Sequence, residues 1–159
     1  MQAHDIEVTS TVDTTFAEVY EREIDGLVRH AALVLGSAAE ANDVVHDAFA
    51  GAYRRWSTLD EPRSYLYRSV INGCRDRWRR AGRERRALEQ LASVGDQPAH
   101  DVLWDVMSEL PLNERLAVVL RYYGGFSQAE IAAHMECPPG SIGPWIRRAL
   151  DRMKEALDD

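Results

Sequence analysis

The run from Tyr65 to Arg80, YLYRSVINGCRDRWRR, combines two chemically different sets of side chains at helical spacing. One set suits a protein core and recurs at steps of four, three and four residues: Tyr67, Ile71, Cys74 and Trp78. The other set is aromatic, polar and basic, and follows the same period on another side: Tyr65, Arg68, Asn72, Arg75 and Arg79. Because both sets follow the helical period, the run predicts one amphipathic helix that packs by its first face and exposes its second.

The exposed face of this helix has two interpretations. Aromatic rings stack on unpaired bases and arginine neutralises phosphate, so such a face suits single-stranded nucleic acid. A basic face can also be simply solvated, and for an isolated stripe that is the more frequent case. The rest of the chain has to decide between the two.

Charge is distributed very unevenly along the 159 residues, whose net charge is −7. Residues 1–50 carry 10 acidic and 2 basic side chains, whereas residues 51–90 carry 11 basic and 5 acidic ones. This segregation fits a helix that binds a polyanion, within a chain that offers acidic surfaces to a cationic protein. It predicts a subunit of a larger assembly, with weak DNA affinity of its own.

The remaining sequence shows the helical period and no alternating strand pattern, which predicts an all-α fold. We expect two small helical domains, at residues 16–87 and 101–159. Residues 88–100 lose the periodicity and contain Gly and Pro, so they are interpreted as a flexible linker, and the polar residues 1–15 as a flexible N-terminus. Helices are expected at about 16–35, 39–56, 62–86, 101–110, 112–123 and 141–157, with a short one after Ser127.

The helix expected at residues 39–56 has an acidic outer face formed by Glu40, Asp43 and Asp47. Its apolar spacing predicts burial of the following side chains: Val44, Val45, Ala48, Phe49, Ala52, Tyr53 and Trp56. Surface charges usually have no specific partner, so the acidic face alone indicates only solvation.

The second domain contains the pattern of a helix-turn-helix. Ser127 and Glu130 form an S-x-x-E capping box, and a turn at residues 136–140 precedes the last helix. That helix is expected to bury Ile146, Leu150, Met153 and Leu157, and to present on another face Ser141, Trp145, Arg148 and Arg152. An ordinary helical hairpin explains this pattern equally well. Together with the basic aromatic helix and the linker, however, bipartite DNA recognition is the simpler explanation.

Catalytic and metal sites are not expected. The sequence lacks a nucleophile paired with a base and a glycine loop for phosphate, so we predict neither an enzyme nor a cofactor. His134 and Cys137 have H-x-x-C spacing, but two ligands cannot complete a zinc site. Without a signal peptide, a C-x-x-C pair or a long apolar span, the chain is expected in the cytoplasm and not inserted in a membrane.

Three segments together resemble the extracytoplasmic-function group, or group 4, of the sigma-70 family: DVVHDAFAGAYRRW from Asp43, the run from Tyr65, and LPLNERLAVVLRYYGGFSQAEIAAHMECPPGSI from Leu110. The resemblance covers nearly the whole chain and implies a sigma-2 domain followed by a sigma-4 domain. Such proteins are dissociable promoter-specificity subunits of bacterial RNA polymerase. The resemblance therefore implies promoter recognition and DNA opening, with core RNA polymerase (the beta-prime and beta subunits), promoter DNA and an anti-sigma factor as partners.

The resemblance also assigns roles to residues. It implies docking on the beta-prime coiled coil by Glu40, Asp43, Asp47 and Phe49, although His46 stands where a glutamine is common. It implies minus-10 recognition, with a flipped base held by the loop at residues 57–63, by Tyr65, Arg68, Asn72, Arg75, Asp76, Arg79 and Arg80. It implies minus-35 contacts by Arg121, Gln128, Ser141, Trp145, Arg147 and Arg148.

One departure from the family pattern leaves alternatives open. Gly143, Pro144 and Trp145 stand where the family often has lysine, serine and arginine, so the minus-35 preference is not predicted. A sigma-like interaction protein, which binds a regulator without productive promoter binding, is one alternative. A stand-alone helix-turn-helix regulator that binds DNA as a dimer is another, although the acidic total and the lack of a dimer signature count against it.

Overall fold

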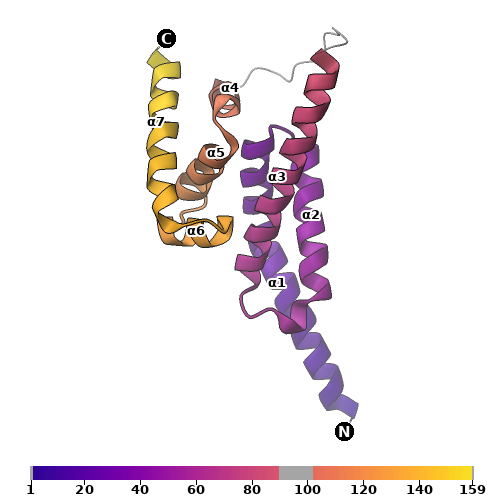
Figure 1. Ribbon diagram of the computed structural model, residues 1–159. Helices are drawn as coiled ribbons and strands as arrows, with labels where there is room; N and C mark the ends of the chain where they lie inside the picture. The colour runs from indigo at the N-terminus through magenta and orange to yellow at the C-terminus, as the bar shows by residue number, and fades with distance from the viewer. Residues whose placement is uncertain (1, 90–101, 159) are drawn as a thin grey trace.

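The computed structural model describes residues 2–89 and 102–158, and all of its elements there are helical (Figure 1). The first bundle contains α1 (Gln2–Leu35), α2 (Ala38–Arg54), the short η1 (Trp56–Thr58) and α3 (Pro62–Glu89). The second contains α4 (Val102–Glu109), α5 (Leu112–Val118), the π-helical η2 (Val119–Tyr123), α6 (Gln128–Met135), η3 (Pro139–Ser141) and α7 (Ile142–Asp158). The predicted all-α fold is confirmed for the described residues.

The first bundle is held by a shared apolar core between α1, α2 and α3. Leu27, Val45 and Leu66, one from each helix, are completely buried. Helix α2 is capped at its N-terminus by Ser37, whose side-chain oxygen accepts a hydrogen bond from the Glu40 amide at 3.2 Å. Gly73 lets α3 approach α2 closely, because a β-carbon there would lie 2.7 Å from the Val44 side chain.

Two boundaries of this bundle differ from those expected. Helix α1 begins at Gln2, and its N-terminal part projects beyond the other helices (Figure 1). The sequence before Gly26 contains neither glycine nor proline, so a helix started within the bundle can continue outward at little cost. Helix α3 runs to Glu89, and the remainder of the expected linker, residues 90–100, lies outside the described residues.

The second bundle contains the predicted helix-turn-helix. The Ser127 hydroxyl accepts from the Glu130 amide at 3.2 Å, and the Ser127 amide donates to the Glu130 carboxylate at 3.1 Å. The capping box is thus confirmed. Helix α6 ends at Met135 and is followed by Glu136, which adopts a left-handed conformation with φ of 54° and directs the chain toward α7.

Some predicted core positions are wrong. Tyr53 is 58% exposed, Leu150 41% and Leu157 65%. On α7 the buried side chains are Ile142, Ile146 and Ala149. The buried stripe therefore lies on a different side of the helix, and nearer its start, than expected. Leu157 lies near the end of α7, and Tyr53 near the end of α2.

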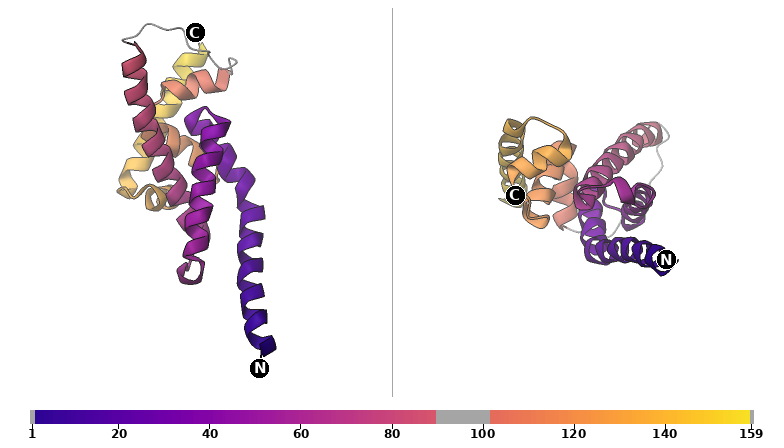
Figure 2. Two further views of the ribbon diagram at one scale, coloured as in Figure 1. Left: turned by 90° about the vertical axis from the view of Figure 1, so that its right-hand side faces the viewer. Right: turned by 90° about the horizontal axis from the view of Figure 1, so that it is seen from below.

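The two bundles pack side by side, a contact that the sequence analysis did not predict (Figures 1 and 2). Arg115 of α5 is fully buried in this contact. Its guanidinium donates to the Val34 carbonyl at the end of α1 and to carbonyls of residues 108 and 110, each at 2.8 Å. It also lies over the Trp78 ring of α3, 4.1 Å from the centroid. One cation therefore joins both domains.

Candidate polymerase and nucleic-acid interfaces

Helix α3 presents several of the residues predicted to contact the minus-10 element. Arg68, Asn72, Arg79 and Arg80 are exposed, whereas Tyr67 and Ile71 on the opposite face are buried. Arg79 pairs with the neighbouring Asp76 at 3.7 Å. The predicted exposed face of this helix is confirmed at Arg68, Asn72 and Arg79, whereas Tyr65 and Arg75, which were expected on the same face, are half-buried.

A cleft between α2 and α3 brings the candidate minus-10 residues next to a candidate docking residue. Tyr65, Asp76 and Arg80 line it from α3, and Asp47 from α2. Gly51 makes room for the Tyr65 side chain, because a β-carbon at residue 51 would lie 2.7 Å from the Tyr65 hydroxyl. Arg77, whose position also matches the minus-10 pattern of the family, lines the cleft as well. Two further lining residues, Arg54 and Ser69, were not predicted, because nothing in the periodicity distinguishes them.

Two other predicted minus-10 residues face the second domain. Arg75 donates through both Nη atoms to the Met135 carbonyl, each at 3.3 Å. Arg68 Nε lies 3.7 Å from a Glu136 carboxylate oxygen. A helix C-terminus carries partial negative charge, so the end of α6 attracts both guanidinium groups. In this arrangement Arg68 and Arg75 contact the protein itself.

The acidic face of α2 is exposed at Asp43 and Asp47 and half-buried at Glu40. Asp43 lies 4.0 Å from an Nη atom of Arg77, an exposed contact that contributes little stability. Phe49 differs from these three residues, since its side chain is 3% exposed and its ring packs edge-on against Tyr20, with centroids 4.9 Å apart. Phe49 therefore supports α2 from the core and does not belong to the exposed face.

The predicted minus-35 residues occupy different environments. Arg147 and Arg148 are exposed on α7, whereas Ser141 and Trp145 are half-buried. Arg121 donates to the Phe126 carbonyl at 3.2 Å and so braces the entrance to the helix-turn-helix.

Gln128, the first residue of α6, lies beside the start of α7. A β-carbon at Gly143 would stand 3.3 Å from the Gln128 side-chain oxygen, tighter than most such contacts. The glycine in the unusual Gly143–Pro144–Trp145 sequence thus accommodates Gln128 between the two helices.

Glu114 is a residue of this region that sequence reasoning missed. It lies on α5 and is buried, yet it contacts two arginines of α7. Arg148 Nε donates to one carboxylate oxygen at 3.2 Å, and Arg152 Nε lies 3.3 Å from the other. The available signal was an acidic residue two positions before the apolar run at residues 116–120.

A cluster of aromatic and histidine rings also lies where the domains meet. The Tyr67 hydroxyl and His30 Nδ1 are 3.3 Å apart, and the Tyr67 ring packs against Phe126 and His134 of the second domain. The Arg63 guanidinium lies 4.8 Å from the Phe126 ring centroid. Burial lowers the pKa of His30 and of His134 below the ordinary 6.5, and the nearby charge of Arg63 acts in the same direction.

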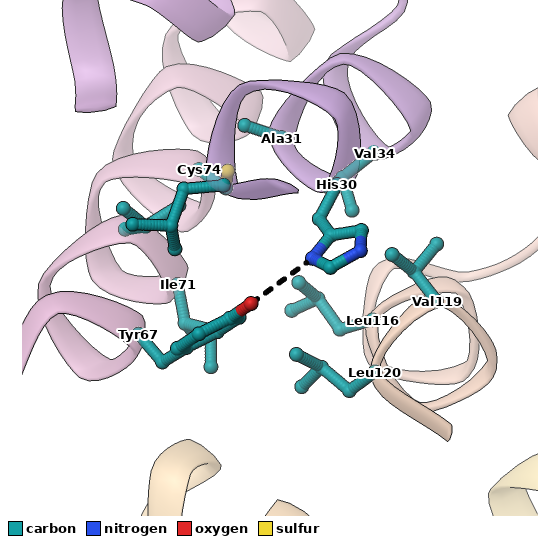
Figure 3. A pocket seen from close by; sticks show the side chains of 11 residues that line it. His30, Ala31, Val34, Tyr67, Ile71, Cys74, Leu116, Val119 and Leu120 are labelled. Atoms are coloured by element: carbon teal, nitrogen blue, oxygen red, sulfur yellow. Dashed lines mark hydrogen bonds between the residues drawn. The ribbon is translucent and has the colours of Figure 1, made fainter. Parts of the chain in front are cut away.

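An apolar pocket continues from this cluster between the domains (Figure 3). Helix α1 contributes His30, Ala31 and Val34, and the other walls come from α3 and from α5 with η2. Burial raises the pKa of the Cys74 thiol in this pocket to about 12, so the thiol stays protonated. The pocket lies where apolar surfaces of the two domains meet. Its lining residues do not include an arrangement of groups that is typical of a catalytic site.

Among the described residues, no helix has both the length and the apolar character required to cross a membrane.

Comparison with known proteins matches both parts of the chain to one family. Residues 19–84 match Sigma-70 region 2, and residues 100–153 match Sigma-70, region 4. The RNA polymerase sigma-E factor of Streptomyces coelicolor is 31% identical, over 89% of this chain and 85% of that protein. The ECF RNA polymerase sigma factor SigM of Mycobacterium tuberculosis is 29% identical, over 89% and 76% of the two chains.

Solved structures show the same fold. The sigma factor RpoE from Bartonella quintana, in complex with the anti-sigma factor NepR, superposes with a TM-score of 0.74 at 23% identity and covers 91% of this chain and 97% of its own. CnrH, in complex with the cytosolic domain of CnrY, gives a TM-score of 0.70 at 25% identity, with 92% and 89% covered. The two family matches and the curated relatives confirm the predicted family and the predicted non-enzymatic role in transcription initiation. With region 2 and region 4 matched in order and a relative 31% identical over most of both chains, the chain belongs to the sigma-70 family as an extracytoplasmic-function RNA polymerase sigma factor.

Proposed function

We propose that this sigma factor docks on core RNA polymerase through the acidic face of α2, contacts the minus-10 element with α3 and contacts the minus-35 element with α7. The observation that carries the proposal is the pair of adjacent, oppositely charged helix faces in the first domain. Asp43 and Asp47 are exposed on α2, while Arg68 and Arg79 are exposed on α3. Two surfaces of opposite sign can bind a cationic protein and a polyanion at the same time.

Docking and melting use these faces in sequence. Binding of α2 to polymerase places α3 against DNA that the enzyme has begun to loosen. Extruding a base costs a few kcal/mol, and stacking on Tyr65 with phosphate contacts to Arg79 and Arg80 offsets that cost. The weak intrinsic affinity expected from a net charge of −7 restricts the reaction to DNA that polymerase already holds.

The packing of the two domains must loosen before every proposed minus-10 residue can reach DNA. Arg68 and Arg75 are engaged by the end of α6, so α6 competes with DNA for them. The RpoE neighbour was solved with an anti-sigma factor, and we propose an anti-sigma partner for this chain too, acting in the cytoplasm. Such a partner would keep the domains together until a signal releases it.

In vitro transcription from a fragment library, with purified core polymerase in the presence and absence of this chain, tests the proposal. New start sites that share two spaced upstream elements are expected. Polymerase that co-purifies with the chain but gives no new starts would indicate a sigma-like interaction protein instead. The library also yields the promoter fragments needed for the variants below.

A further inference from the structure

The environment of Glu114 is unusual for a carboxylate. Its side chain is 6% exposed, and the residues that follow it on α5, Leu116 and Ala117, belong to the core. A buried carboxylate is costly unless opposite charges and hydrogen bonds compensate it. The compensation here comes from two guanidinium groups of another helix, Arg148 and Arg152 of α7.

Both arginines use the same atom to reach Glu114. Arg148 Nε donates to Oε1 at 3.2 Å, and Arg152 Nε lies 3.3 Å from Oε2. The side chains themselves remain 56% and 55% exposed. The inner nitrogen of Arg148 is therefore held by a hydrogen bond and that of Arg152 by charge, while the terminal Nη groups of both keep donors for a further acceptor.

The cluster remains positively charged, because two guanidinium groups meet one carboxylate. Arg148 and Arg152 are four residues apart and so occupy the same face of α7 on successive turns. This is the face that the proposed function turns toward DNA. Holding a long side chain in place before binding lowers the entropy cost of the contact, so a fixed pair of guanidinium groups binds phosphate or a base edge more tightly than a free pair.

Resting on that proposed function, we propose that Glu114 is a positioning residue for minus-35 recognition: its buried carboxylate orients Arg148 and Arg152 of α7 toward promoter DNA. The two arginines depend on it unequally. Arg148 makes a hydrogen bond to Glu114, whereas Arg152 Nε lies 3.3 Å from Oε2, an oxygen that accepts no hydrogen bond from the described residues. Arg148 is therefore the arginine whose contact with DNA depends most on Glu114.

The test measures minus-35 preference in the reconstituted holoenzyme. The probe is a promoter fragment from the library, and the preference is its affinity divided by that of the same fragment with a scrambled minus-35 element. Glu114→Gln keeps the shape and removes the charge, and it is expected to lower the preference roughly tenfold, the scale of one lost specific contact. An unchanged or increased preference overturns the proposal, an increase meaning that Glu114 competes with DNA for the arginines.

A matched control is Glu155→Gln, which removes the same charge from an exposed position on α7. It is expected to leave the preference at the wild-type value, and an equal loss would show a general charge effect and overturn the positioning role.

A double-mutant comparison separates positioning from folding. In a chain that already carries Arg148→Gln and Arg152→Gln, the further change Glu114→Gln should have no additional effect, because there is nothing left to orient. An additional tenfold loss would mean that Glu114 acts through the fold, against the proposal.

If Glu114→Gln does not fold, Arg148→Lys provides the measurement. A single ammonium cannot bind Glu114 and DNA through separate nitrogens, so most of the preference should be lost, and wild-type preference in this variant overturns the proposal. A wild-type holoenzyme without any minus-35 preference would instead overturn the proposed role of α7 and this inference together. If the wild type has a minus-35 preference and every variant keeps it, this inference alone is overturned.

Discussion

Single arginines in this protein have roles that their residue type does not reveal. Arg115 is fully buried and bonds three backbone carbonyls, whereas Arg79 is 70% exposed and forms an ion pair with the neighbouring Asp76. Burial makes Arg115 part of the scaffold, because an uncompensated charge there would be costly. Exposure leaves Arg79 able to exchange a weak pair for a phosphate contact.

Replacing Arg79 tests whether α3 opens DNA separately from docking. Arg79→Ala removes one proposed phosphate contact and leaves the acidic face of α2 intact. We expect polymerase binding in a pull-down to be retained, and open-complex formation, followed by permanganate reactivity of unpaired thymines, to fall by roughly tenfold. Loss of both activities would contradict the assignment of Arg79 to the minus-10 element.

Protonation of the interface histidines provides a pH prediction. The folded state lowers the pKa of His30 and His134 from 6.5, chiefly by burial, so the unfolded chain binds protons first as the pH falls. The free energy of unfolding is therefore highest, as far as these two histidines are concerned, above about pH 6.5. It decreases as the pH falls through that value toward their lower folded pKa. Around His30 the charged groups are Arg29, Arg63 and Glu23, and around His134 they are Glu130, Arg68, Arg63 and Glu61.

Thermal unfolding between pH 7.5 and 5.5 checks this prediction. The wild type should lose melting temperature toward acid, and a variant with His30→Gln and His134→Gln should lose less. Equal slopes for the two proteins would show that carboxylate titration, and not these histidines, determines the acid response.

How well each helix could be predicted depends on whether the residues that determine it lie within the helix or elsewhere in the chain. Helix α6 was located by its own capping residues, Ser127 and Glu130, because the bonds that start it are local. The buried face of α7 was not, since its rotation depends on which side α5 occupies. The same reasoning explains Glu114: nothing local to α5 indicates two arginines that lie 34 and 38 residues further along the chain.

The capping box allows a prediction for one helix terminus. Ser127→Ala removes the acceptor of the Glu130 amide and should lower the free energy of unfolding by about 1 kcal/mol. Ser127→Asp, which restores an acceptor at the cap, should recover most of that loss. Chemical denaturation followed by circular dichroism measures both variants, and equal stability of Ser127→Ala and wild type would show that the cap contributes nothing.

At the scale of the molecule, the two domains were predictable and their contact was not. Each domain follows from helical periodicity interrupted by glycine and proline, which are local signals. The contact joins Arg115 to Val34 and Arg75 to Met135, pairs separated by 81 and 60 residues. Periodicity shows that Arg75 is on an exposed face, but it cannot show that the end of α6 covers that face.

Gly36 controls this contact and gives the prediction for the whole molecule. It ends α1 with φ of 72°, and a β-carbon there would collide with the Trp104 ring of the second domain. Gly36→Ala should therefore displace Trp104, separate the domains and increase the radius of gyration in small-angle scattering. Gly125→Ala is the matched control, because φ is 71° and, apart from the two chain neighbours, no described residue has an atom within 4 Å of the new carbon, so backbone strain is the same but nothing is displaced. If Gly36→Ala stays as compact as Gly125→Ala, Trp104 does not hold the domains together. If only Gly36→Ala expands, the contact that covers Arg68 and Arg75 depends on a residue without a side chain.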